Sequence, residues 1–167
     1  MRHVIVDGYN VLHAEPEYER LAERDIDVAR ARLVEDVAAW AAGESRAFVV
    51  FDGAGNPRST GRPHHVAGVA VVFSAAGVDA DSVIEALAHR FRAEGHEVVV
   101  ATSDAETQNA VMGSGALRMS SSELAAELRR SNEEARLSGT SGRPAGRLEE
   151  RIDPRVRDVL SRWARGR

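Results

Sequence analysis

Four short runs of apolar, mostly β-branched residues constrain the fold of this chain more than any other feature. They cover residues 3–6, 48–51, 66–73 and 98–101. Continuous runs of this length predict buried strands, which are typical of parallel sheets. Helical patterns lie between them over residues 27–42 and 82–94, and a glycine follows each helix closely as a stop signal. This alternation predicts an α/β fold with a central, mainly parallel sheet flanked by helices.

Aspartates stand at the end of each run or a few residues beyond it. They are Asp7, Asp52, Asp79, Asp81 and Asp104. Ligands of open parallel sheets bind outside the carboxyl ends of the strands, so we expect these acids to meet at one edge. Gathered carboxylates repel one another, and Mg²⁺ or Mn²⁺, which prefer oxygen ligands, would relieve the repulsion. One aspartate at a strand end is often only a helix cap. Four acid-bearing strand ends favour a metal site that could act on phosphate oxygens.

Three polar residues stand beside these acids. Asn10 follows Asp7 by three residues, where its amide could reach a metal-bound water or a phosphate, or could cap a helix. Thr102 and Ser103 precede Asp104, and their hydroxyls could hydrogen-bond a metal-binding carboxylate or cap the next helix.

Composition narrows the chemistry. The 167 residues suit one domain, and the absence of cysteine excludes disulfides, thiolate zinc sites and cysteine nucleophiles. All 22 basic residues are arginine, so no catalytic lysine is available. Residues 1–114 hold 10 arginines and 18 acids, whereas residues 115–167 hold 12 arginines and 8 acids. This asymmetry suits metal-binding carboxylates with a phosphate-contacting tail, although a solvated helical tail has the same pattern. Without a long apolar run or a signal-peptide pattern, we expect a cytoplasmic protein with no membrane partner.

The last third of the chain predicts an appended helix. Residues 138–146 have the composition of a flexible connector, and Asp153 with Pro154 predicts the start of a helix. Its apolar stripe contains Val156, Leu160 and Trp163. We therefore expect a domain over residues 1–137, with residues 138–167 forming a connector and an arginine-rich helix that packs on the domain or extends it.

Four motifs and the C-terminal segment together resemble a known family. The four motifs are VDGYN at 6–10, VFDG at 50–53, DADSVIEAL at 79–87 and ATSD at 101–104, and the C-terminal segment is RIDPRVRDVLSRWARG at 151–166. In this order and over nearly the whole chain, they resemble the YacP-like branch of the NYN domains, which are PIN-like nucleases. The resemblance implies a three-layer fold and a metal-dependent endoribonuclease that leaves 5′-phosphate and 3′-hydroxyl ends.

The resemblance also implies roles for particular residues. It makes Asp7, Asp81 and Asp104 the catalytic acids that bind Mg²⁺ or Mn²⁺, with Asn10 as the supporting polar residue. The fourth acid of many PIN domains has no single match here. Glu85, one turn after Asp81, and Asp79 are both candidates, and each has a simpler role as a surface-pair partner or a helix cap. Asp52 could bind the metal directly or only orient the loop after it.

RNA is the expected partner, and residues 53–65 are the expected contact. This segment is rich in Gly, Pro, Ser and Arg and predicts a mobile surface loop. We expect Arg58, Arg62, His64 and His65 to close on the RNA backbone, unless the loop is simply solvated. The two histidines should point to opposite faces of an extended segment, which disfavours a zinc site. Relatives in the family include a ribosome-associated enzyme that cuts mRNA, which makes the ribosome a further expected partner.

Other enzyme classes fit less well. A dehalogenase-type phosphatase needs an acid where Tyr9 stands, a response-regulator receiver needs a lysine, and a serine hydrolase needs a G-x-S-x-G elbow, which is absent. The main alternative is a non-catalytic RNA- or ribosome-binding module with the same fold, and a toxin-like PIN protein is a third. The sequence leaves the oligomeric state open.

Overall fold

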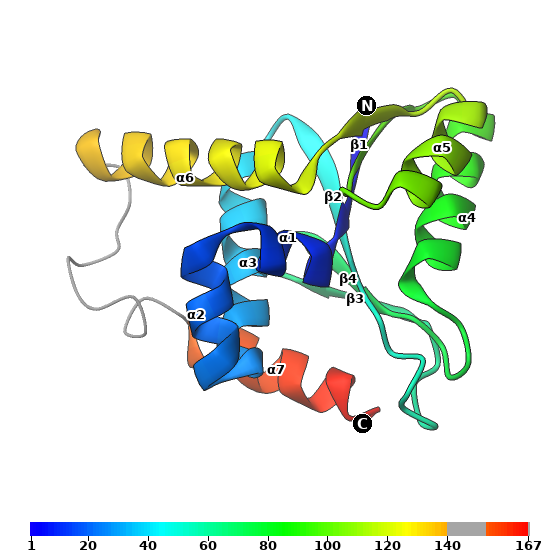
Figure 1. The fold of residues 1–167 in the computed structure, drawn as a ribbon. Helices are drawn as coiled ribbons and strands as arrows, with labels where there is room; N and C mark the ends of the chain where they lie inside the picture. The colour runs from blue at the N-terminus through cyan, green and yellow to red at the C-terminus, as the bar shows by residue number, and fades with distance from the viewer. Residues whose placement is uncertain (140–152, 167) are drawn as a thin grey trace.

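The computed structural model describes residues 1–139 and 153–166 of the chain (Figure 1). Six strands and seven helices occur in these residues. In chain order they are β1 (Arg2–Asp7), α1 (Gly8–Ala14), α2 (Pro16–Arg24), α3 (Ile26–Ala41), β2 (Ser45–Phe51), β3 (Pro63–Val66), β4 (Val69–Phe73), α4 (Ala80–Ala93), β5 (Glu97–Ala101), α5 (Ala105–Gly113), β6 (Leu117–Met119), α6 (Ser121–Leu137) and α7 (Pro154–Ala164).

The strands form one sheet in the order β3-β4-β2-β1-β5-β6. All neighbouring pairs are parallel except β3 with β4. β1 lies in the interior, where Val4 pairs with Ala47 of β2 on one side and Val99 of β5 on the other. This position explains why the first apolar run has no polar alternation, because both faces of an interior parallel strand are covered. The predicted mainly parallel α/β sheet is confirmed.

Helices cover the two faces of the sheet and give three layers. Figure 1 shows α1, α2, α3, α6 and α7 on one side and α4 and α5 on the other. Successive side chains of β1 point alternately towards the helices on one face of the sheet and those on the other. Val4 and Val6 belong to the core shared with α3, α6 and α7, whereas Ile5 belongs to the core under α4. The two cores hold the sheet rigidly, so the ends of its strands are fixed relative to one another.

The sequence predicted one strand over residues 66–73, and this prediction is wrong. The run contains the end of β3, a turn and β4, which together belong to a hairpin. Val66 of β3 pairs with Val69 of β4, and Ala67 and Gly68 between them have φ values of 52° and 83°. Two successive positive φ values are typical of the tight two-residue turn that matches the twist of antiparallel strands. β3 begins at Pro63, so the predicted loop over residues 53–65 ends earlier than expected.

α7 packs on α3 and contributes to the same core as the sheet. Val156 and Leu160 are buried in that core, and the Asp153 side chain caps the helix by accepting from the backbone N–H of Arg155. The predicted helix start is therefore confirmed. Residues 140–152, which include most of the predicted connector, lie outside the described residues, and the division at residue 137 stays a prediction.

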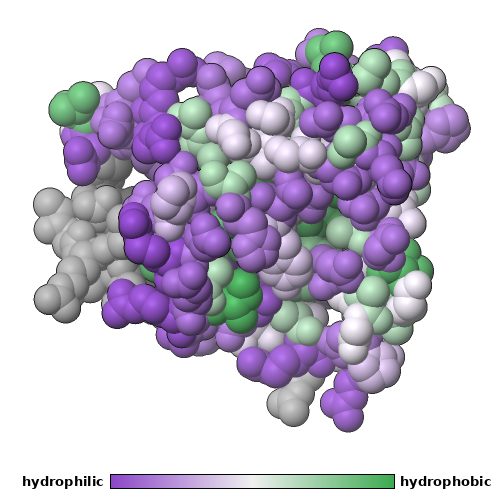
Figure 2. All heavy atoms as spheres, in the orientation of Figure 1, coloured by the Kyte–Doolittle hydropathy of each residue, from purple (hydrophilic) through white to green (hydrophobic). Residues whose placement is uncertain are grey.

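The surface seen from the side of Figure 1 is largely hydrophilic, with small separated hydrophobic areas (Figure 2). No helix in residues 1–139 or 153–166 has the length and apolar composition that crossing a bilayer requires.

Candidate active site

The aspartates singled out by the sequence lie around the carboxyl edge of the sheet. Asp7 is the last residue of β1, and Asp52 directly follows β2. Asp104 is the N-cap of α5 after β5, and Asp81 lies in the first turn of α4. Because β1 lies between β2 and β5 and runs parallel to both, their carboxyl ends are adjacent. We call this group of Asp7, Asp52, Asp81 and Asp104 the acid edge.

Asp7 is the most perturbed carboxylate of the acid edge. It is only 8% exposed. Burial raises the pKa of Asp7 to about 6, and the negative charges of Asp81 and Asp104 act in the same direction. Hydrogen bonds from the Thr102 side chain and the Asn10 backbone oppose the rise. A buried carboxylate beside two others is an environment that a cation would stabilise strongly.

Asp81 and Asp104 respond differently to the same edge. Burial raises the pKa of Asp81, and the charges of Asp104, Asp79 and Asp52 raise it further, against a hydrogen bond from Thr107. The pKa of Asp104 is lowered, because its carboxylate accepts from both the side chain and the backbone N–H of Thr107. The charges of Asp81 and Asp104 contribute to the raised pKa of Asp7, and the charge of Asp104 contributes to the raised pKa of Asp81, as expected for acids that share one edge of the sheet.

The segment after β5 holds two of these acids in place. The Thr102 hydroxyl donates to Oδ2 of Asp7 at 2.9 Å and accepts from the backbone N–H of Asp104 at 3.1 Å. Thr102 thus makes the contact with a carboxylate that was expected of it. Ser103 does not contact an acid in this way, because its hydroxyl accepts from the backbone N–H of Ser121 at 3.0 Å.

Asn10 joins three elements at the acid edge. It lies in the first turn of α1, and its side-chain oxygen accepts from the backbone N–H of Ser103 at 2.8 Å and from the Ser121 hydroxyl. Its oxygen therefore ties α1 to the β5–α5 segment and to the start of α6. Asn10 does not cap α1, whose N-cap position is held by Asp7.

The sequence did not single out three residues that support the site. Thr107 is fully buried, and its hydroxyl donates to Oδ2 of Asp104 at 2.7 Å. Gln108 donates to the backbone oxygen of Thr102 at 2.6 Å, and Ser121 bonds Asn10. A signal existed for Thr107, because it stands three residues after an N-cap aspartate, where a side chain returns to the cap. Ser121 lies more than a hundred residues after Asn10 in the sequence, and no local pattern indicates that the two residues are in contact.

Asp52, Asp79 and Glu85, the other acid candidates of the sequence, have local contacts of their own. Asp52 is exposed, and its Oδ1 accepts from the backbone N–H of Ala54 at 2.8 Å, which orients the loop that follows. Asp79 caps α4 by accepting from the backbone N–H of Ser82 at 2.8 Å, and hydrogen bonding to Ser82 lowers the pKa of Asp79. Glu85 lines a groove between α4 and α5 together with His89 and Arg92.

The four residues expected to contact RNA do not form one surface. Arg58 and Arg62 are exposed. His64 lies on β3 and stacks on Trp163 of α7, with ring centroids 4.1 Å apart. His65 faces the other side of the sheet and lines a cavity with Phe48. The expectation that the histidines point apart is met, and the expectation that both lie in a loop is wrong, because β3 begins at Pro63.

The loop between β2 and β3 is held by hydrogen bonds, which differs from the mobile loop expected. Asn56 donates to the backbone oxygen of Ala164 in α7 at 2.7 Å, and Ser59 donates to that of Ser74 at 2.7 Å. The backbone N–H of Gly53 donates to the Ser74 hydroxyl at 2.9 Å. The C-terminal helix therefore helps to position the loop that carries Arg58 and Arg62.

The acid edge fits a hard divalent cation in its chemistry. All its donors are carboxylate oxygens, and Asp7 carries a raised pKa that a cation would lower. Within the described residues, no three His, Cys, Asp or Glu side chains are gathered closely enough to enclose a metal ion. Mg²⁺ commonly binds proteins through one or two carboxylates and keeps several waters, so an open edge of this kind suits it better than a closed cage.

Comparisons with known proteins agree with this architecture. The family model described as the YacP-like NYN domain matches residues 4–165. The uncharacterized protein YacP of Bacillus subtilis (strain 168) is 32% identical over 167 residues, which cover 98% of this chain and 96% of the relative. The crystal structure of Rae1 (YacP) from Bacillus subtilis is 32% identical, with a TM-score of 0.68 over 99% of this chain and 96% of that one. A crystal structure of a tryptophan-to-leucine mutant of Rae1 has a TM-score of 0.66 and 30% identity over 95% of this chain and 98% of that one. The chain therefore belongs to the YacP-like NYN domain family.

Proposed function

We propose that this protein is an endoribonuclease that needs Mg²⁺ or Mn²⁺ and hydrolyses phosphodiester bonds at the acid edge. The family has a nuclease-like fold, which makes nucleic acid the natural substrate class. The observation that carries the proposal is Asp7, a buried carboxylate whose pKa is raised to about 6 beside Asp81 and Asp104. A buried charge costs free energy unless it is compensated, so a carboxylate at this position favours a role in binding a cation.

Asp7, Asp81 and Asp104 would hold the metal. When bound, such an ion supplies an activated water and neutralises charge on the phosphate. The residues of the chain supply orientation. Thr102 fixes one oxygen of Asp7, and Thr107 fixes one oxygen of Asp104, so each carboxylate keeps a defined direction before substrate arrives. Asp52 adds negative charge to the same edge, and it is a weaker candidate ligand because the loop already uses one of its oxygens.

RNA would approach across the loop between β2 and β3. Arg58 and Arg62 are exposed there and would contact the RNA backbone, which contributes affinity without sequence preference. His64 and His65 are poorer candidates, because one is stacked on Trp163 and the other faces a cavity on the opposite side. Following the family resemblance, we propose mRNA on the ribosome in the cytoplasm as the substrate.

A second candidate function is a non-catalytic RNA-binding module. It is favoured by one observation, the lack of three enclosing metal ligands within the described residues. The module and the enzyme differ in what happens to bound RNA, since only the enzyme cleaves it and only the enzyme loses activity when a chelator is added.

Cleavage of end-labelled single-stranded RNA tests the proposal. Wild type should cut with Mg²⁺ or Mn²⁺ and should stop in EDTA. Asp81→Asn should abolish cleavage, whereas Asp158→Asn, the same change at an exposed position of α7, should leave it intact. Full activity of Asp81→Asn would contradict the proposal. If purified RNA is bound but uncut by wild type, cleavage in a translating extract decides between the module and an enzyme specific for ribosome-bound RNA.

A further inference from the structure

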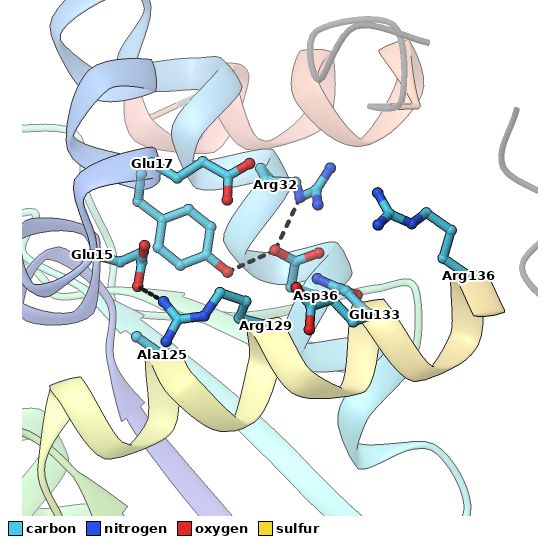
Figure 3. A pocket seen from close by; sticks show the side chains of 10 residues that line it. Glu15, Glu17, Arg32, Asp36, Ala125, Arg129, Glu133 and Arg136 are labelled. Carbon is cyan, nitrogen blue, oxygen red and sulfur yellow. Dashed lines mark hydrogen bonds and ion pairs between the residues drawn. The ribbon is translucent and has the colours of Figure 1, made fainter. Parts of the chain in front are cut away.

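A polar cavity of about 240 Å³ lies between α2, α3 and the C-terminal half of α6 (Figure 3). Its wall includes Tyr18 and Arg32 on one side and Asn132 and Arg136 of α6 on the other. No residue of the acid edge lines this cavity, and neither do Asn10 and Ser121. The cavity is therefore separate from the proposed active site.

Arg32 gives this cavity a buried donor that lacks an acceptor. Its side chain is only 7% exposed, and its Nε donates to Oδ2 of Asp36 at 2.9 Å. The Tyr18 hydroxyl donates to the same oxygen at 2.6 Å, so the carboxylate holds the guanidinium in a fixed direction. Nη1 of Arg32 is buried and has no hydrogen-bond partner in the part of the chain that the structure describes. Buried donors are nearly always satisfied, so this N–H group is available to an acceptor that enters the cavity.

The rest of the cavity lining carries charges of both signs. Arg129 pairs with Glu15 at 2.8 Å and is thereby neutralised. Arg136, Glu17 and Glu133 line the cavity, and none of them has an ion pair with another residue of 1–139 or 153–166. In Figure 3 the Arg136 side chain extends from α6 in the direction of Arg32.

This lining selects for a ligand that carries both charges. A simple anion would gain from Arg32 and Arg136 but would be repelled by Glu17 and Glu133. A simple cation would leave Nη1 of Arg32 without an acceptor. We propose that the cavity binds a small zwitterion of the α-amino-acid class, with its carboxylate towards Arg32 and Arg136 and its ammonium group towards the glutamates. The volume lies below the usual range for larger organic ligands and suits a molecule of this size.

NMR titration of the full chain tests this proposal at the residue concerned. The proteinogenic L-amino acids are added one at a time while the Nε–H signal of Arg32 and the backbone signals of α6 are followed. At least one amino acid should shift these signals in a saturable way. Its two analogues, the same skeleton without the amino group and without the carboxylate, should each bind much more weakly. Saturation by neither amino acid nor analogue, or equal binding of an analogue, would overturn the proposal.

A pair of variants on α6 separates specific binding from a general charge effect. Arg136→Gln should weaken binding of the amino acid by about fivefold, as expected for one partly exposed ion pair. Arg130→Gln removes the same charge from the same helix at an exposed residue that pairs with Glu127 and does not line the cavity, and it should change nothing. Equal effects of the two variants would overturn the proposal. Both positions are exposed, so neither change should prevent folding.

Discussion

Replacing Asp7 with asparagine should stabilise the metal-free protein while it removes the proposed activity. Burial raises the pKa of Asp7 from 3.8 to about 6, which means that the folded state prefers the protonated carboxyl. Ionising it in the folded protein therefore costs free energy that ionising it in the unfolded chain does not. Asparagine carries no charge at any pH, and its side-chain oxygen can still accept from Thr102.

The magnitude follows from the size of the shift. A difference of about two pKa units corresponds to roughly 3 kcal/mol of unfolding free energy. The penalty is absent below the unfolded pKa of 3.8 and grows as the pH rises through about 6, above which it is complete. Asp7→Asn should therefore match wild type near pH 4 and exceed it by about 1–3 kcal/mol at pH 8, after allowance for imperfect accommodation of the amide.

Urea denaturation in EDTA across this pH range measures the effect. Asp79→Asn is a suitable control. A hydrogen bond from Ser82 lowers the pKa of Asp79, so the ionised Asp79 carboxylate stabilises the folded state, whereas the ionised Asp7 carboxylate destabilises it. That stabilisation is present at neutral pH and is lost as the pH falls, so Asp79→Asn should not stabilise the protein at pH 8. A loss of stability for Asp7→Asn at pH 8, or a gain that does not change with pH, would refute the reasoning.

Three further changes test the surroundings of the acid edge. Thr107→Val removes the hydroxyl that donates to Asp104 and should cost about 1–2 kcal/mol in urea denaturation and lower the cleavage rate; an unchanged rate would argue against a positioning role. Changing Arg58 and Arg62 together to glutamine should weaken RNA binding and reduce the slope of log affinity against log salt by about 1.4; an unchanged slope would show that they do not contact phosphates. Gly8→Ala should cost about 1–3 kcal/mol in thermal denaturation, because its Cβ would lie 2.4 Å from an aromatic ring of β2; full stability would mean that this ring can move aside.

The sequence predicted the sheet well because interior parallel strands leave a strong local signal. β1, β2 and β5 are continuous apolar runs, and the aspartates that follow them reach one edge through the parallel pairing alone. The hairpin of β3 and β4 was missed because its turn contains Ala67, a residue type that rarely adopts a positive φ. In the sequence, Ala67 therefore looked like part of the continuous apolar run over residues 66–73.

Local sequence patterns could not predict the contacts between segments that are far apart in the chain. The sequence placed Asn10 near the acids but could not reveal that its oxygen bonds Ser103 and Ser121. The composition of residues 53–65 predicted a free loop, yet Asn56 is bonded to the end of α7, more than a hundred residues away. Such contacts depend on how helices dock on the sheet, which composition and periodicity do not specify.

The most direct test of the central claim is the opening of a closed circular RNA. Only an endonuclease can convert the circle to a linear molecule, and the ends of the product report the chemistry. We expect linear RNA with a 5′-phosphate and a 3′-hydroxyl from wild type with Mg²⁺ or Mn²⁺, and intact circles in EDTA or with Asp7→Asn. Opening of the circle by Asp7→Asn at the wild-type rate, or by wild type in EDTA, would contradict the central claim.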